Sequence, residues 1–225
     1  MNKKLFIILG VFSTINGMDL PVRIPREWPA EEYANGGNAK QVANFIDLLI
    51  RHQIDTSTDN VISFGCGTGE IEKYVAQKAK TVHGIDASEN MINVARTNQS
   101  KINNLTFEHC FAEDFKTKQH YDLALMSCCF HWFENKKQAL ERISDSLRMH
   151  GKLFTNIETE SNPIPFGIAV YEDMKRDVPL ICTLLAALPN PTGSARLTDT
   201  ELKDMLYHTN FEILRYQTES FDWTM

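Results

Sequence analysis

The sequence predicts an α/β protein built on a doubly wound, mostly parallel sheet with helices on both faces. Short apolar segments of strand length alternate along the chain with longer segments of helical periodicity, which is typical of such a sheet. A glycine-rich turn follows the first of these strands, and an aspartate ends the second. The carboxyl edge of a parallel sheet is where open α/β folds bind ligands, so we expect the functional site there.

The elements follow in order from the hydrophobic pattern. Residues 40–52 place apolar side chains at helical i, i+3, i+4, i+7 and i+8 positions, so one face of this helix packs on the sheet. The expected strands are at about 60–64, 81–85, 105–109, 122–128, 152–157 and 211–216, and the other expected helices are at about 69–79, 88–98 and 134–148.

A glycine-rich turn, Gly65-Cys66-Gly67-Thr68-Gly69, links the first of these strands to a helix, and the next strand ends at Asp86. Glycine lets the backbone adopt positive φ and lets a ligand approach the main chain closely. A carboxylate at the tip of the neighbouring strand is well placed to accept both hydrogen bonds of a ribose diol. The pattern predicts a nucleoside site, and the alternative is an ordinary turn between a strand and a helix.

The glycine spacing bears on which nucleotide is bound. A dinucleotide fingerprint reads G-x-G-x-x-G and cradles a pyrophosphate, whereas this turn reads G-x-G-x-G with Glu70 in the last glycine's place. A carboxylate there repels a pyrophosphate, although it stabilises an empty helix N-terminus. The spacing therefore disfavours an NAD-dependent oxidoreductase, which is the rival enzyme class.

From about Tyr33 to Phe154 the chain resembles the class I S-adenosylmethionine-dependent methyltransferases. The first motif of that family reads much like residues 64–69, and residues 86–91, 107–115 and 121–127 resemble its second motif, third motif and fourth strand. The resemblance implies a Rossmann-like fold and S-adenosyl-L-methionine as cofactor. The cofactor-binding residues that it implies are Tyr33, Gly65, Cys66, Gly67, Asp86, Ala87, Met91, Ala112, Glu113 and Ser127.

The segment Phe130-His131-Trp132-Phe133 is similar to small-molecule O-methyltransferases of the trans-aconitate and juvenile hormone acid type. This similarity implies methyl transfer to an oxygen, carboxylate or hydroxyl, of a small-molecule acceptor. His131 is the candidate catalytic residue, either as a base toward a hydroxyl or as a guide for a carboxylate. Trp132 is the candidate substrate contact. The alternatives are a histidine that only shapes the pocket and a tryptophan that only packs.

Three departures from the family pattern favour a second hypothesis, a degenerate and non-catalytic relative that acts as an interaction module. Ser63 replaces the usual acid near the glycine turn, and serine cannot offset an ammonium charge. Phe111 replaces the acid that commonly meets the adenine amino group. The family also adds a seventh, antiparallel strand beyond 211–216; residues 217–225 form a short version of it, or it is missing. A missing strand leaves a sheet edge that a second copy of the chain can cover.

Composition is that of one globular enzyme domain, with 225 residues, 43% of them apolar and 23% charged. A formal net charge of −6 disfavours a nucleic-acid partner. The five cysteines show no paired C-x-x-C spacing suited to zinc, so no metal site is expected.

Residues 1–17 are expected to lie outside the domain, which then spans 18–225. Lysines followed by the apolar run 5–12 resemble a secretory signal, and the run is too short to span a membrane. A start at Met18 instead yields a cytoplasmic enzyme, which is the expected location, with export as the alternative. The proline-rich residues 161–193 are expected to form a small lid after strand five, or else to pack as ordinary structure.

Overall fold

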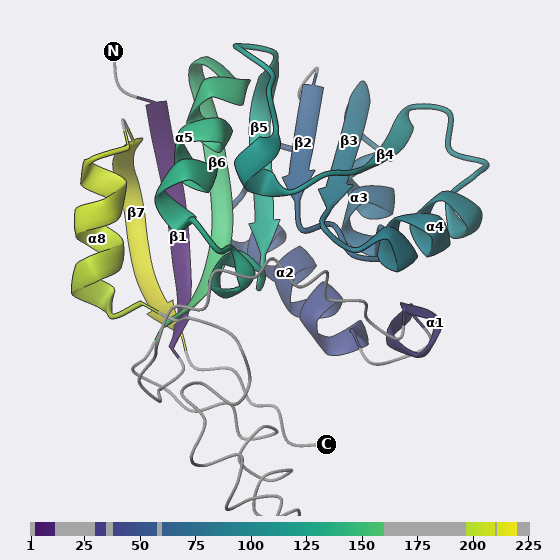
Figure 1. The fold of residues 1–225 in the computed structure, drawn as a ribbon, viewed down its shortest axis with the longest axis horizontal. Coiled ribbons are helices and arrows are strands. Elements are labelled where there is room, and N and C mark those ends of the chain that lie inside the picture. Colours follow the sequence, from purple (N-terminus) through teal and green to yellow (C-terminus); the bar gives the residue numbers. More distant parts are fainter. Residues whose placement is uncertain are drawn as a thin grey trace, which may run out of the picture.

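The computed structural model describes residues 3–11, 30–34, 38–57, 60–159, 197–209 and 211–219. Within these residues the chain forms a seven-stranded sheet with helices on both faces, and this confirms the predicted fold class (Figure 1). The strands are β1 (Lys3–Val11), β2 (Asn60–Phe64), β3 (Thr81–Asp86), β4 (Leu105–His109), β5 (Tyr121–Ser127), β6 (Leu147–Thr159) and β7 (Phe211–Glu219). The helices are α1 (Ala30–Glu32), α2 (Ala39–Arg51), α3 (Glu70–Val75), α4 (Glu89–Asn98), α5 (Lys136–Ser146) and α8 (Asp199–Tyr207), with short 3-10 turns η2 (Ala112–Asp114) and η3 (Phe130–Trp132).

The strand order is β4-β3-β2-β5-β6-β1-β7, and each described ladder is parallel. From β2 the chain first moves outward through β3 to β4, then returns to the other side of β2 with β5. The order therefore reverses between β2 and β5. Such a reversal opens a crevice at the carboxyl ends of the strands, which is the ordinary ligand site of a doubly wound sheet.

The core lies on both faces of the sheet because successive residues of a strand point to opposite sides. In β2, Ile62 and Phe64 are buried in a cluster that includes the apolar face of α5, and Val61 is buried in a second cluster with α2 and α3. The rings of Phe45 in α2 and Phe154 in β6 lie 5.3 Å apart in the second cluster. Burying each such large side chain stabilises the fold by about 1.5–3 kcal/mol.

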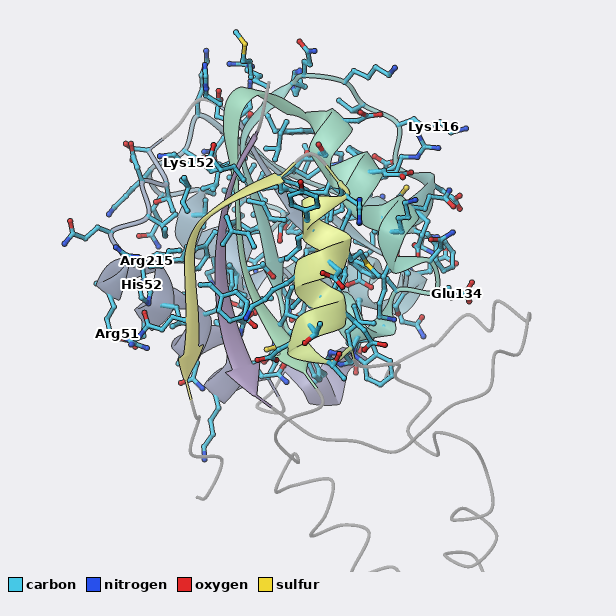
Figure 2. All side chains as sticks on the ribbon, turned by 90° about the vertical axis from the view of Figure 1, so that its left-hand side faces the viewer. Arg51, His52, Lys116, Glu134, Lys152 and Arg215 are labelled. Carbon is cyan, nitrogen blue, oxygen red and sulfur yellow. The ribbon has the colours of Figure 1, made fainter. Side chains whose placement is uncertain are left out.

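The N-terminal segment differs from the expectation that residues 1–17 lie outside the domain. Residues 3–11 form β1, which lies between β6 and β7, with Leu5 opposite both Leu153 and Ile213 (Figures 1 and 2). The physical reason is that a short apolar run of strand length has the same composition in a signal peptide and in a buried parallel strand. For residues 3–11 the expectation is therefore corrected.

The first strand β1 and the last described strand β7 are neighbours at one edge of the sheet. Arg215 of β7 and His52, which follows α2, lie side by side, with Arg215 Nη1 2.9 Å from His52 Nδ1 (Figure 2). Residues 217–219 were expected to begin a short seventh strand or none. They instead continue the strand predicted at 211–216, and together these residues form β7. No antiparallel strand occurs in the described residues, and the predicted lid at 161–193 lies outside them.

A shortened chain that begins at Met18 tests the place of β1. We expect its melting temperature to fall by more than about 10 °C, since β7 loses its neighbour in the sheet and each kcal/mol corresponds to roughly 2–4 °C in a domain of this size. Thermal melts, with hydrogen exchange of residues 211–219, measure the loss. A melt within a few degrees of the full chain would place residues 3–11 outside the cooperative fold.

Helix α8 is an element that the sequence analysis did not predict. Thr198 and Glu201 form a capping box at its start, because each side chain accepts a hydrogen bond from the other residue's backbone N–H. This S/T-x-x-E pattern was a readable start signal. No helix among the described residues has the length and apolar character needed to cross a membrane.

Candidate functional site

The glycine turn lies at the carboxyl end of β2, beside the reversal of strand order. Gly65, Gly67 and Gly69 all have positive φ, at 69°, 55° and 84°. The backbone N–H groups of Gly65 and Cys66 both donate to the carbonyl oxygen of Ile85, at 2.8 and 3.0 Å, and these bonds attach the turn to β3. The turn is therefore held in place from the neighbouring strand.

The three glycines are required for different reasons. A Cβ on Gly65 would lie 2.6 Å from the Cβ of Cys129, and one on Gly69 would lie 2.5 Å from the ring of Phe107. A Cβ on Gly67 would meet nothing closer than the ring of Tyr33, at 3.9 Å, among the described residues. Gly65 and Gly69 thus serve packing, and Gly67 is the position where a ligand can approach the main chain.

Asp86 connects the tip of β3 to this open glycine. Its Oδ2 accepts a hydrogen bond from the Gly67 N–H, and its Oδ1 accepts one from the Ser88 N–H, both at 2.9 Å. Burial raises the pKa of the Asp86 carboxyl, and these two hydrogen bonds oppose the rise. An ionised carboxylate has about four lone-pair sites, so Asp86 keeps acceptor capacity for a ribose diol.

The segment before α2 reaches across to the turn. Tyr33, which the sequence analysis selected, lies against Gly67, and its hydroxyl donates to Gln41 Oε1 at 2.6 Å. Asn38 Nδ2 donates to Thr68 Oγ1 at 3.2 Å, and both of these residues are buried. Sequence reasoning missed Asn38, because an asparagine at a helix start is ordinarily read as a cap.

Four of the cofactor-binding residues that the resemblance implies follow β3 and β4. Ala87 comes after Asp86, and Met91 lies buried in the first turn of α4, whose start is capped by Ser88. Ala112 and Glu113 lie in η2, and Glu113 Oε1 accepts a hydrogen bond from the backbone N–H of Asn135 at 3.2 Å. The structure thus gives Glu113 a contact to the start of α5, and its role in cofactor binding stays a prediction.

His131 is presented by a strained turn at the end of β5. After Ser127, Cys128 adopts a φ of 48°, which is uncommon for a residue with a side chain. Asn156 of β6 supports this turn: its Oδ1 accepts from the Cys128 N–H, and its Nδ2 donates to Cys128 Sγ, both at 3.0 Å. Such backbone strain costs about 1–3 kcal/mol and is typical of functional sites.

The turn leads directly into η3, which carries the candidate reaction residues. His131 is only 5% exposed, and its ring centroid lies 4.9 Å from that of the partly buried Trp132. Trp132 also packs against the cluster that contains Phe130. The position of His131 beyond β5, at the carboxyl edge, is as predicted, and its catalytic role stays a prediction.

Glu72 is a buried carboxylate that the sequence analysis did not select. Neither side-chain oxygen has a hydrogen-bond partner of ordinary geometry among the described residues, although the side chain is fully buried. Burial raises the pKa of its carboxyl to about 7; the nearby Ser63 hydroxyl opposes the rise, and Asp86 adds to it. The sequence does contain a pattern that could have identified Glu72: it is a charged residue on the helix face that otherwise carries apolar residues 75, 76 and 79.

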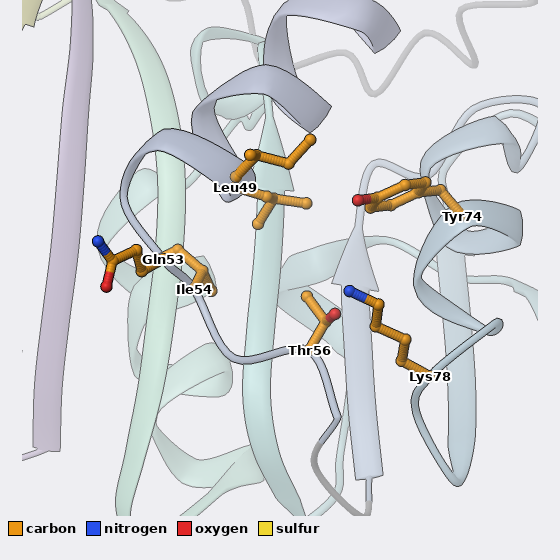
Figure 3. Close-up of a pocket in the computed structure, with 7 residues that line it drawn as sticks. Leu49, Gln53, Ile54, Thr56, Tyr74 and Lys78 are labelled. Atoms are coloured by element: carbon orange, nitrogen blue, oxygen red, sulfur yellow. The ribbon is translucent and has the colours of Figure 1, made fainter.

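A separate pocket of about 310 Å³ lies between the end of α2 and α3 (Figure 3). Its lining comes from α2, from the segment that leads to β2 and from α3, and includes none of the residues selected above. No group of three or more His, Cys, Asp or Glu side chains in the described part of the chain could hold a metal ion. The lining residues are Leu49, Ile50, Gln53, Ile54, Thr56, Tyr74 and Lys78.

Comparison with known families identifies the segment that contains this site. The family model described as a methyltransferase domain matches residues 61–151, from β2 to the early part of β6. Residues 61–151 carry a methyltransferase domain. The match includes the glycine turn, Asp86 and His131, and it confirms the family that the sequence motifs predicted.

Curated methyltransferases are similar to this chain over more than half of its length. A malonyl-[acyl-carrier protein] O-methyltransferase of Bacillus cereus is 28% identical over 126 residues, which cover 55% of this chain and 46% of that enzyme. An uncharacterised methyltransferase of Oceanobacillus iheyensis is 27% identical over 160 residues, covering 64% of this chain and 74% of that protein. The chain spans about half the length of the malonyl-[acyl-carrier protein] enzyme that it matches.

Solved structures share the fold of the methyltransferase domain. The YcgJ protein of Bacillus subtilis superposes with a TM-score of 0.56 at 17% identity, over 76% of this chain and 67% of that protein. A Methanococcus maripaludis protein, assigned as an S-adenosyl-L-methionine-dependent methyltransferase, superposes with a TM-score of 0.55 at 16% identity. The superposition covers 85% of this chain and 88% of that protein. These likenesses confirm the Rossmann-like architecture.

The predicted cofactor, S-adenosylmethionine, is the methyl donor of this class of domain, and the residues present fit it. The free lone pairs of the Asp86 carboxylate can accept the hydrogen bonds of a ribose diol. The absence of a side chain at Gly67 leaves space between its main chain and the ring of Tyr33. Both features lie at the reversal of strand order, where the fold places its ligands.

Proposed function

We propose that this protein transfers a methyl group from S-adenosylmethionine to an oxygen, carboxylate or hydroxyl, of a small molecule. The observation that carries the proposal is the bond from the Gly67 N–H to Asp86, at a turn that is open above Gly67. The buried His131 and the neighbouring Trp132 follow β5, the strand next to β2, and we assign them to the part of the site that binds the methyl acceptor. The O-methyltransferase named among the relatives supports oxygen as the acceptor atom.

The bound cofactor supplies an activated methyl group on its sulfonium, so the chain has mainly to align the acceptor and exclude water. Asp86 binds the ribose hydroxyls, and the Gly67 turn receives the cofactor along its main chain. His131 positions a carboxylate acceptor, or takes the proton of a hydroxyl acceptor on an imidazole nitrogen. Trp132 forms an apolar wall that shields the reacting atoms from solvent.

Replacing Asp86 with alanine should weaken cofactor binding by about 1.5–3 kcal/mol, the range for hydrogen bonds to a charged group. The variant also leaves the N–H groups of Gly67 and Ser88 without their acceptor, so part of the loss comes from a less ordered turn. Calorimetric titration with S-adenosylhomocysteine measures the change in affinity, and a thermal melt confirms that the variant is folded.

The matched control is Glu89→Ala, which removes an exposed carboxylate from the first turn of the neighbouring helix α4. It should leave the affinity within about twofold of the native chain, since a surface charge near a helix start contributes only about 0.3–1 kcal/mol to the helix itself. Equal affinities of the Asp86 variant and the native chain would show that Asp86 does not bind the cofactor.

The proposed reaction is tested by incubating the protein with cofactor labelled on the methyl group and a panel of small acids and alcohols. A malonyl thioester belongs in the panel, because the similar Bacillus cereus enzyme is named for such an acceptor. Methyl ester or ether products are expected. Transfer to protein or RNA, with none to any small molecule, would overturn the small-molecule assignment.

The second candidate is a relative that binds the cofactor and does not catalyse transfer, acting as an interaction module. Ser63 and Phe111, at positions where the resembled family has acids, favour it. Binding of S-adenosylhomocysteine together with no transfer to any acceptor class would select this candidate.

The predicted homodimer through the C-terminal sheet edge stays a proposal. It is supported by Ile213 and Leu214 of the edge strand β7, which are 38% and 39% exposed. Sedimentation of the native chain against a variant with both residues changed to lysine tests it. A cytoplasmic location also stays a proposal.

A further inference from the structure

Glu72 places a buried carboxylate in the first turn of α3, directly after the glycine turn, and no cation is among the groups that act on it. The side chain is fully buried, and neither oxygen has a hydrogen-bond partner of ordinary geometry among the described residues; the Ser63 hydroxyl is its nearest polar support. The Ser63 hydroxyl of β2 favours its ionised form as a hydrogen-bond donor. The charged or titratable groups that act on it are Cys66 of the turn, Glu70 of α3 itself, Asp86 of β3 and Cys129 after β5. None of these groups is a cation.

Burial without a counter-charge destabilises the ionised form of a carboxylate, so the pKa rises and the group keeps its proton. Burial, with the negative charges of Asp86 and Glu70, raises the pKa of Glu72 to about 7. At neutral pH the group is therefore about half protonated. A cation brought next to it would stabilise the ionised form and release the remaining proton to solvent.

Building on the proposed function, we propose that the Glu72 carboxylate receives the ammonium group of S-adenosylmethionine and loses its proton when that cation binds. The ammonium is joined to the ribose through the chain that carries the sulfonium, and the ribose is assigned to Asp86. Glu72 lies in the first turn of α3, directly after the glycine turn, and Asp86 is bonded to the same turn through the Gly67 N–H, so a cofactor held at Asp86 extends along a turn that leads to Glu72. Serine at position 63 carries no charge to compete for this role.

The proposal makes a pH-dependent prediction that needs no catalysis. The affinity for S-adenosylhomocysteine, which carries the ammonium, should fall about tenfold from pH 8 to pH 6, because the protonated carboxyl must first ionise. Near pH 7 binding should release about half a proton, seen by calorimetry in buffers of different ionisation enthalpy. Methylthioadenosine keeps the nucleoside thioether and lacks the ammonium, so its affinity should not change with pH.

Glu72→Gln keeps the shape of the side chain and removes its charge. The variant should bind S-adenosylhomocysteine about tenfold more weakly than the native chain at pH 8, with no pH dependence, and should bind methylthioadenosine equally well. Without ligand it should melt above the native chain at pH 8, because an acid with a raised folded pKa loses stability as pH rises from about 4.5 to 7. That difference should vanish toward pH 5.

The control is Glu70→Gln, a partly exposed neighbour on the same helix that already interacts with Lys73 and Gln99. Its affinity should still depend on pH, with the midpoint moved to lower pH because the Glu70 charge no longer raises the pKa of Glu72. A pH-independent affinity of the native chain for S-adenosylhomocysteine would overturn the role of Glu72 and leave the proposed function standing. Failure of both nucleosides to bind at any pH would overturn the proposed function itself. The native pH profile decides the matter even if the Glu72 variant does not fold.

Discussion

Replacing Gly67 with valine is expected to leave a folded protein that no longer binds S-adenosylmethionine. The φ of 55° at Gly67 costs a residue with a side chain about 1–2 kcal/mol, which lowers the melting temperature by only a few degrees. The new side chain would occupy the space between the turn and Tyr33. It would therefore block the approach to the main chain, and calorimetry should detect no binding.

The neighbouring Gly65 provides the comparison. Gly65→Ala puts a Cβ within 2.6 Å of Cys129, so it should destabilise the fold by about 1–3 kcal/mol through overpacking. The two variants should thus separate, with loss of binding at position 67 and loss of stability at position 65. Full cofactor binding by Gly67→Val would mean that the turn has only a structural role.

Replacing His131 with alanine has an outcome that depends on the acceptor. For a hydroxyl acceptor the histidine acts as a base, and its loss should lower the turnover number by about 10²–10⁴-fold. A carboxylate acceptor is already ionised at neutral pH, so the loss should chiefly raise KM. Steady-state kinetics on an acceptor found in the labelled screen measures the two effects separately.

Two further variants define the role of His131. His131→Gln keeps a polar side chain that cannot transfer a proton near neutral pH, so it should restore KM and not the turnover of a hydroxyl acceptor. His120→Ala removes an exposed histidine at the opposite end of β5 and should change neither parameter. Native kinetics in the His131→Ala protein would show that the buried ring only shapes the pocket.

Elements that combine a clear hydrophobic period with a defined boundary were predictable from the sequence. The strand predicted at 60–64 is β2, and the glycine turn and Asp86 lie together at its end. Helix α5 is shorter than the predicted 134–148, because Asn135 caps its start and the chain turns into β6 after Ser146. Local signals therefore located most of the elements that position the site.

Features that depend on tertiary contacts were not predictable in the same way. The composition of residues 3–11 suits a signal peptide as well as a strand, and only pairing with β6 and β7 distinguishes the two. The bond from Asn38 to Thr68 joins residues far apart in the chain, and no local pattern specifies it. For Glu72 the helical period shows which face the charge lies on, and only the folded structure shows that its oxygens are buried without an ordinary hydrogen-bond partner among the described residues.

Calorimetric titration of the native chain with S-adenosylhomocysteine, repeated with NAD, tests the central claim most directly. A cofactor site formed by Gly67 and Asp86 predicts one binding site for S-adenosylhomocysteine, no binding of NAD, and a rise in melting temperature with S-adenosylhomocysteine concentration. Binding of NAD, or no heat with S-adenosylhomocysteine in a protein that melts cooperatively, would contradict the account.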